Sequence, residues 1–198
     1  MKLPSRIALA TLAVLSTSLS LKAGEPVKHT NPVQTSFSDE KPAYLYFKEG
    51  AFTRTGSQRV DFEVQLAGEI GLAARKQEVV FTISFDIDNT ASTGREAITF
   101  PGLGVDATVW LKKEPNLSKF NAYSDEVMVG GKKYEIEITQ SKVSNDKIEV
   151  SMKSELFAKY PDFRVYALSK HTFLEKGRET SEIVVDQFPR RGALTIAQ

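Results

Sequence analysis

The chain has 198 residues, with 26 lysines and arginines against 25 aspartates and glutamates, and a formal net charge of +1. This near balance gives no reason to expect nucleic acid or another polyanion as a partner. The absence of cysteine excludes disulfides and a lipid-modified N-terminal cysteine, so the fold must be held by its core or by a metal.

The first 23 residues have the order of a secretory signal peptide. Two basic residues lie within the first six positions, the apolar run 7–15 follows, and a segment of small and polar residues, 16–23, comes next. Because the apolar run is too short to span a bilayer, we expect cleavage after Ser20 or Ala23, and a periplasmic or secreted protein. A buried N-terminal helix is the alternative. No later apolar stretch approaches the length of a transmembrane segment.

The chain after the signal peptide divides into three parts. Residues 24–41 are polar and contain proline, so we expect a flexible, exposed lead-in. Residues 42–189 show the alternation of half-buried strands and form the predicted domain, and residues 190–198 are a C-terminal tail. We expect strands over 43–47, 60–66, 79–87, 105–111, 134–139, 148–152 and 163–168, with a less regular segment at 122–129. Gly130-Gly131 and Ser144-Asn145-Asp146 provide turn residues between these runs.

One short helix is expected in the stretch before Pro161, with Ser154 as its N-cap. Seven to nine short strands with turns between them, and almost no helix, predict an all-β fold. We favour an antiparallel β-sandwich with at most one short helix, and a barrel is the alternative. No internal repeat or linker divides the chain, so one domain is expected.

Three aspartates lie near the ends of two strands that we expect to be neighbours. In the third expected strand the apolar residues alternate with polar ones, so Asp86 and Asp88 project together from the opposite face. Asp106 lies in the next expected strand, 105–111, and can approach them if the two strands pair and the connection 89–104 folds over their ends. Hard oxygen donors in this number suit Ca²⁺, and the Ser92-Thr93-Gly94 turn could add backbone carbonyls.

Other interpretations of this acidic loop remain open. Asp-x-Asp-Asn followed by Thr and Gly is also ordinary turn chemistry, in which side-chain oxygens cap loop amides. The stretch is not an EF-hand, because Ala91 and Ala97 stand where the invariant Gly and the bidentate Glu would be. Softer metals have no thiolate to bind, and His29 and His171 lie far apart in sequence. A catalytic carboxylate pair is a third possibility, but nothing else in the sequence resembles a substrate cleft.

The segments 85–94 (FDIDNTASTG) and 102–111 (GLGVDATVWL) carry a resemblance to a known group of domains. They are similar to the pattern D-x-D-N-x-x-x-T-G … G-x-G-x-D of exported bacterial β-sandwich modules related to family-nine carbohydrate-binding modules and DOMON-like domains. The similarity spans most of residues 43–189, and only this central motif is specific. It implies a jelly-roll-like sandwich with a Ca²⁺ site at Asp86, Asp88 and Asp106, with Asn89, Thr93 and Gly94 nearby.

The chain departs from that group in its aromatic residues. Sugar-binding members use paired aromatic platforms, and this chain has a single tryptophan, Trp110. It could stack on a sugar or a partner, or it could pack across strands against Val80 or Thr82. We expect a non-enzymatic exported binding module with a structural Ca²⁺ loop, which binds carbohydrate or another envelope component. The alternatives are an interaction subunit that docks on a partner protein, and a hydrolase that uses the acidic cluster.

Overall fold

A computed structural model describes residues 24–38, 41–71, 77–97, 99–175 and 178–197. The predicted signal peptide lies outside these residues. Within the described ranges, none of the helices has the length and apolar character needed to cross a membrane.

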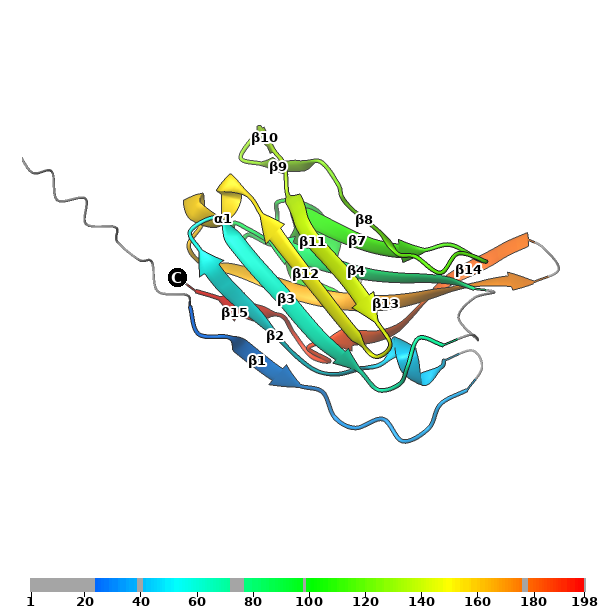
Figure 1. The fold of residues 1–198 in the computed structure, drawn as a ribbon. Helices are drawn as coiled ribbons and strands as arrows, with labels where there is room; N and C mark the ends of the chain where they lie inside the picture. The colour runs from blue at the N-terminus through cyan, green and yellow to red at the C-terminus, as the bar shows by residue number, and fades with distance from the viewer. Residues whose placement is uncertain (1–23, 39–40, 72–76, 98, 176–177, 198) are drawn as a thin grey trace, which may run out of the picture.

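Two antiparallel β-sheets lie face to face and form a sandwich (Figure 1). Sheet A consists, in spatial order, of β1 (Val27–Thr30), β2 (Phe47–Gly56), β3 (Arg59–Leu66), β12 (Lys147–Lys153) and β11 (Glu137–Ser144). Sheet B consists of β14 (Arg178–Phe188), β13 (Phe163–Glu175), β4 (Glu78–Asp86), β7 (Ala107–Lys113) and β8 (Asn121–Ser124), with β15 (Leu194–Ile196) also paired to β13. The prediction of an all-β antiparallel sandwich is confirmed.

The smaller elements do not belong to these two sheets. Two short hairpins pair β5 (Arg95–Ala97) with β6 (Phe100–Val105), and β9 (Val127–Val129) with β10 (Lys132–Tyr134). A 3₁₀ turn, η1 (Ala43–Leu45), precedes β2, and one helix, α1 (Glu155–Lys159), lies between β12 and β13. The predicted N-cap is confirmed, because the Ser154 hydroxyl accepts a hydrogen bond from the backbone N–H of Leu156 at 3.3 Å.

The core lies between the two sheets and follows from the period-two pattern. In β3 the side chains of Val60, Phe62, Val64 and Leu66 are buried, while the intervening residues are exposed or half-buried. β4 is buried on both faces from its second residue to its last. Its inner face packs in the sandwich core, and its outer face lies partly beneath the β5–β6 hairpin.

The β5–β6 hairpin, which we call the flap, forms a second small core on the outer face of sheet B. This core consists of Ala97, Leu103 and Val105 from the flap with Tyr166 and Leu168 from β13. The ring of Phe100 also meets the ring of Tyr166 edge to face, with centroids 5.0 Å apart. The flap is therefore packed on sheet B and does not extend freely from it.

The predicted strand 43–47 is wrong over its first four residues, of which the first three form a 3₁₀ turn. In η1 the N–H of Leu45 bonds to the carbonyl of Pro42 at 3.0 Å, and the N–H of Tyr46 bonds to that of Ala43 at 3.1 Å. Tyr44 and Leu45 are both buried although they are adjacent in sequence, which a strand with one buried face does not allow. The sandwich strand begins instead at Phe47.

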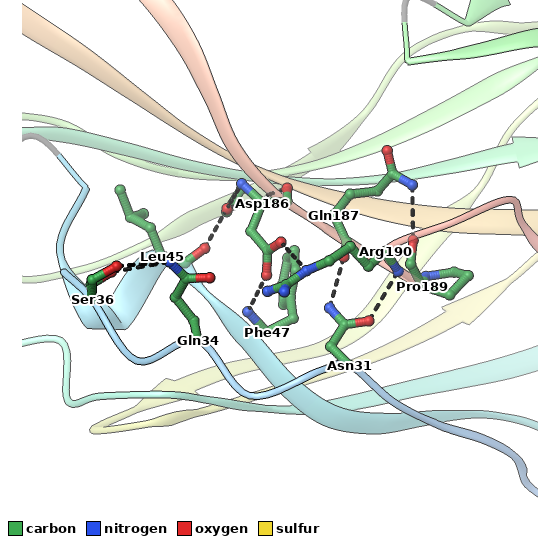
Figure 2. A network of polar contacts seen from close by, with 10 residues as sticks. Asn31, Gln34, Ser36, Leu45, Phe47, Asp186, Gln187, Pro189 and Arg190 are labelled. Atoms are coloured by element: carbon green, nitrogen blue, oxygen red, sulfur yellow. Dashed lines mark hydrogen bonds and ion pairs between the residues drawn. The ribbon is translucent and has the colours of Figure 1, made fainter.

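Part of the expected lead-in pairs with sheet A through β1, and an asparagine after β1 contacts the end of β14 (Figure 2). Asn31 is only 2% exposed; its Nδ2 donates to the carbonyl of Gln187 at 2.8 Å, and its Oδ1 accepts from the N–H of Arg190 at 2.9 Å. Beside it, Asp186 accepts from Arg190 Nε at 3.2 Å and from the N–H of Phe47 at 2.9 Å. These bonds join the N-terminal segment to both sheets.

Candidate metal centre

Three aspartates meet where β4 ends and β7 begins. Asp86 is the last residue of β4, Asp88 follows in the turn, and Asp106 lies between β6 and β7. The two strands pair with Phe85 opposite Ala107, so Asp106 returns to the same end of the sheet as Asp86. One carboxylate oxygen from each aspartate lies within 4.8 Å of the others, so the cluster could hold a metal ion.

Two of these carboxylates are buried, and each has one oxygen without a hydrogen-bond partner. Asp86 is fully buried and Asp106 is 8% exposed. Oδ2 of Asp86 is bonded to the guanidinium of Arg164, and Oδ2 of Asp106 accepts from the N–H groups of Ile87 at 2.8 Å and Asp88 at 3.4 Å. Oδ1 of Asp86 and Oδ1 of Asp106 have no partner among the described residues. Because buried oxygens are nearly always satisfied in native proteins, this pair requires an explanation.

The charges in the cluster repel one another. Burial raises the pKa of Asp106 from its usual 3.8 to about 6, and the negative charges of Asp88 and Asp86 add to the rise. Hydrogen bonds from Ile87 and Asp88 oppose it. Among the described residues, the ion pair found at this cluster is that of Asp86 with Arg164, so the three carboxylates have an excess of negative charge that a bound cation would neutralise.

The turn after β4 also uses its side chains as caps. Oδ1 of Asp88 accepts from the N–H of Thr90 at 3.0 Å and from the Thr93 hydroxyl at 2.8 Å. Asn89 has a φ of 55°, and its Nδ2 donates to the carbonyl of Asp162 at 2.9 Å. Turn chemistry and a carboxylate cluster that could hold a cation therefore coexist here: Thr93 and Asn89 hold the turn, and the three carboxylates lie close together.

Two glycines let the arms of the loop approach closely. Gly94 has a φ of 70°, and a Cβ there would lie 2.4 Å from the carbonyl oxygen of Val105. A Cβ on Gly104 would lie 2.1 Å from the carbonyl oxygen of Thr93 and 2.4 Å from that of Thr90. A Cβ atom does not come this close to a carbonyl oxygen in real proteins. Glycine at both positions therefore lets the two backbone arms of the loop lie against each other.

Arg164 is a residue of the candidate site that the sequence did not reveal. It lies directly opposite Asp86 in the pairing of β13 with β4, and its guanidinium forms an ion pair with the buried carboxylate. The two residues are 78 positions apart. In the sequence, the only local sign of this role is an isolated arginine within an apolar run. Its partner, Asp86, becomes evident only once β13 is paired with β4.

Trp110, which the sequence suggested as a ligand-binding residue, lies on the outer face of sheet B, away from the sandwich core. It pairs directly with Thr82 on the neighbouring strand β4, as the packing alternative anticipated. On β8 the ring of Tyr123 lies parallel to it, with an interplanar angle of 7° and centroids 6.2 Å apart. The Lys170 ammonium lies 5.1 Å from the centroid of the indole ring. Trp110 also lines a cavity of about 150 Å³ beneath the flap.

No protein-family model, curated protein or solved structure gave a significant match to the chain. Function must therefore be inferred from the chemistry of the aspartate cluster and of the surfaces beside it.

A larger cleft of about 500 Å³ lies beside β10 and the start of α1. Its lining includes Lys132, Lys133 and Lys153 together with Glu135 and Glu155, so charges of both signs are interspersed. None of the buried side-chain atoms found without a partner in the described chain belongs to this lining. The cleft therefore lacks the unmet hydrogen-bonding capacity that distinguishes the aspartate cluster.

Proposed function

We propose that this protein is a non-enzymatic β-sandwich binding module whose connection between β4 and β7 is held by a bound Ca²⁺ ion. The observation that carries this proposal is the pair of buried, unpartnered oxygens, Oδ1 of Asp86 and Oδ1 of Asp106, next to a third carboxylate. Ca²⁺ takes about six to eight oxygen ligands and tolerates the irregular geometry of a loop. The chain has no thiolate, and the metal-ligand cluster found among the described residues contains only carboxylates, which suits a hard cation.

The proposed role of the ion is structural. It would neutralise the mutual repulsion of three carboxylates and tie the end of β4 to the start of β7. Because the unfolded chain does not hold these residues together, the ion would bind only the folded protein and stabilise it by mass action.

The geometry is unfavourable for the hydrolase alternative. Oδ2 of Asp86 is bonded to Arg164, and Oδ1 of Asp88 caps the turn, so neither carboxylate is poised for proton transfer. Glycoside hydrolases hold their two carboxyl groups about 5 to 9.5 Å apart with the substrate between them. Here the carboxylate oxygens lie within 4.8 Å of one another, and neither cavity described above is lined by these aspartates.

The proposed ligand is carbohydrate or another component of the bacterial envelope, bound after export to the periplasm or the medium. The resemblance of the motif to carbohydrate-binding modules motivates this choice. The aromatic pair of Trp110 and the 45%-exposed Tyr123 on the outer face of sheet B supports it, because sugars stack on exposed aromatic rings. Retention of a stoichiometric protein partner, with no glycan bound, would instead favour the interaction-subunit alternative.

Thermal unfolding of the purified protein before and after exhaustive chelation tests the cation proposal. We expect the melting temperature to fall by several degrees on chelation and to recover with Ca²⁺ but not with Mg²⁺, which demands a stricter octahedron. Asp88→Asn should lose the response, and Asp61→Asn, at a surface ion pair with Arg59, should keep it. An unchanged melt together with no metal in elemental analysis would refute the proposal.

A further inference from the structure

The ion pair between Arg164 and Asp86 places a positive charge at the edge of the aspartate cluster. Arg164 lies opposite Asp86 in the pairing of β13 with β4, and its guanidinium is bonded to Oδ2 of the buried carboxylate. Oδ1 of the same carboxylate has no partner among the described residues. A cation on Oδ1 and the guanidinium on Oδ2 would therefore share one carboxylate group.

The contacts of the Arg164 side chain indicate that it acts through its charge. Its Nη2 bonds to Asp86, while its Nε is shielded from solvent and has no hydrogen-bond partner in the described part of the chain. The buried Arg54 differs, because its guanidinium bonds to the backbone carbonyls of Tyr160 and Pro161 and so joins separate segments. Compensation of the Asp86 carboxylate is therefore the role that the contacts of Arg164 support.

The cluster and its arginine together have a charge that one divalent ion balances. With Asp86, Asp88 and Asp106 ionised and one guanidinium beside them, the group carries three negative charges and one positive charge, a net charge of −2. A divalent cation brings this charge to zero, whereas a trivalent cation would leave an uncompensated positive charge beside a fully buried residue. Without the arginine the net charge would be −3, which a trivalent ion would match.

Repulsion between the guanidinium and a bound ion lowers the affinity for that ion. Ca²⁺ binds carboxylate oxygens at about 2.3–2.6 Å, so an ion on Oδ1 of Asp86 would lie on the order of 5 Å from a guanidinium on Oδ2. The Coulomb energy at this distance is proportional to the charge of the ion, and solvent at the 30%-exposed arginine screens it. If the repulsion costs a divalent ion about tenfold in affinity, it costs a trivalent ion about thirtyfold.

We propose that Arg164 is a built-in counter-ion that sets the affinity of the cation site and its selectivity for divalent ions. This inference rests on the proposed cation site. An arginine that instead oriented Asp86 for binding would act in the opposite direction, because its loss would misplace a ligand oxygen and weaken the binding of every ion. The sign of the change on removing Arg164 therefore separates a charge effect from an orienting effect.

Isothermal titration of the purified, metal-free protein with Ca²⁺, and separately with La³⁺, tests this role at pH 7, above the pKa of Asp106 of about 6. We expect Arg164→Gln to bind Ca²⁺ about tenfold and La³⁺ about thirtyfold more tightly than wild type, so the preference for La³⁺ rises about threefold. Arg164→Lys keeps the positive charge and should stay within about threefold of wild type for both ions. Arg59→Gln, at a surface pair with Asp61, should change neither affinity.

Arg164→Gln leaves a buried carboxylate without its partner, so this variant could be unfolded in the absence of metal. In that case Ca²⁺ is titrated into the unfolded variant, and the concentration at which half of the chain refolds reports the affinity. We expect refolding, because the ion replaces the lost counter-charge. A variant that stays unfolded in saturating Ca²⁺ would contradict the proposal.

Binding by the wild-type protein and binding by the variants decide different points. If wild type binds neither ion, the proposed function fails and the role of Arg164 fails with it. If wild type binds Ca²⁺ and Arg164→Gln binds it equally or more weakly, the cation site stands and Arg164 is not its counter-ion. An equal gain for both ions, or the same gain in Arg164→Lys, would also overturn the charge mechanism.

Discussion

The backbone N–H of Ile87 donates a 2.8 Å hydrogen bond to the Asp106 carboxylate, so an acidic side chain joins the turn after β4 to the start of β7. The N–H of Asp106 in turn donates to the carbonyl of Phe85 at 2.9 Å. Oδ1 of Asp106 has no hydrogen-bond partner among the described residues, and the carboxylate lies beside two others. The same residue therefore supports the loop and supplies the negative charge that a cation would balance.

Asp106→Asn should change stability in opposite directions with and without Ca²⁺. Without the ion, the folded pKa of Asp106, about 6, is above its usual 3.8, so the folded protein binds more protons than the unfolded chain between about pH 4 and 6. The wild-type protein then loses stability as the pH rises through this window, and the asparagine should be more stable by about 1–2 kcal/mol at pH 7.5. With Ca²⁺ bound, the asparagine should be the less stable variant.

Urea unfolding from pH 4 to 7.5, in chelator and in excess Ca²⁺, measures how the stability of each protein depends on pH in the two conditions. Subtracting the Asp106→Asn curve from the wild-type curve removes the contributions of other titrating groups. A difference between the two proteins that does not vary with pH in chelator would contradict the assigned burial of this carboxylate.

Arg164→Gln should leave the fully buried Asp86 without its counter-charge. Removing one member of a buried pair costs about 3–5 kcal/mol, and we expect about 2–4 kcal/mol because the arginine side chain is 30% exposed. The loss should shrink in Ca²⁺, which would neutralise the same carboxylate. Arg59→Gln, at a surface pair with Asp61, is the matched control and should cost less than about 1 kcal/mol. Equal losses in the two variants would show that Asp86 does not depend on Arg164.

Gly104→Ala should disrupt the loop through its backbone. The added methyl group would lie 2.1 Å from the carbonyl oxygen of Thr93, so the two arms of the loop must move apart. We expect a loss of about 1–3 kcal/mol in chemical unfolding, together with weaker Ca²⁺ binding. At Gly71 the same methyl group would meet nothing nearer than 4.0 Å, so Gly71→Ala should stay within about 0.5 kcal/mol of wild type. A neutral Gly104→Ala would mean that the arms are not packed together.

The sequence predicted the parts of this molecule that depend on local periodicity. Alternation in 60–66 and 79–87 identified two central strands, and the same period brought Asp86 and Asp106 to one end of neighbouring strands. Arg164 was not predictable in this way, because its position opposite Asp86 arises from the pairing of strands that are distant in sequence.

The shortest strands also escaped prediction, for a different reason. β1 and β15 are only four and three residues long, too short to show a sustained alternation. Their main-chain hydrogen bonds to β2 and β13 define them, and side-chain composition carries little information about such bonds. The flap was likewise hidden within the long connection 89–104, where glycine and polar residues obscure its alternation.

Asn31→Ala should show how firmly the N-terminal segment is attached. Both polar atoms of this buried side chain are bonded, to Gln187 and Arg190, so the substitution leaves a donor and an acceptor unpaired (Figure 2). We expect a loss of about 1–3 kcal/mol in urea unfolding and faster proteolysis before residue 38. Gln34→Ala removes only exposed bonds to Ser36 and should have an effect below about 0.5 kcal/mol. Identical proteolysis of both variants would contradict the proposed attachment.

Isothermal titration of the chelated protein with Ca²⁺ tests the proposed cation site most directly. We expect one ion to bind per chain, with affinity that falls as the pH drops below about 6, because Asp106 must give up its proton to bind the ion. Asp88→Asn and Asp106→Asn should each bind at least about tenfold more weakly, and Asp61→Asn should match wild type. No heat from the wild-type protein, or the same isotherm from wild type and both cluster variants, would contradict the site.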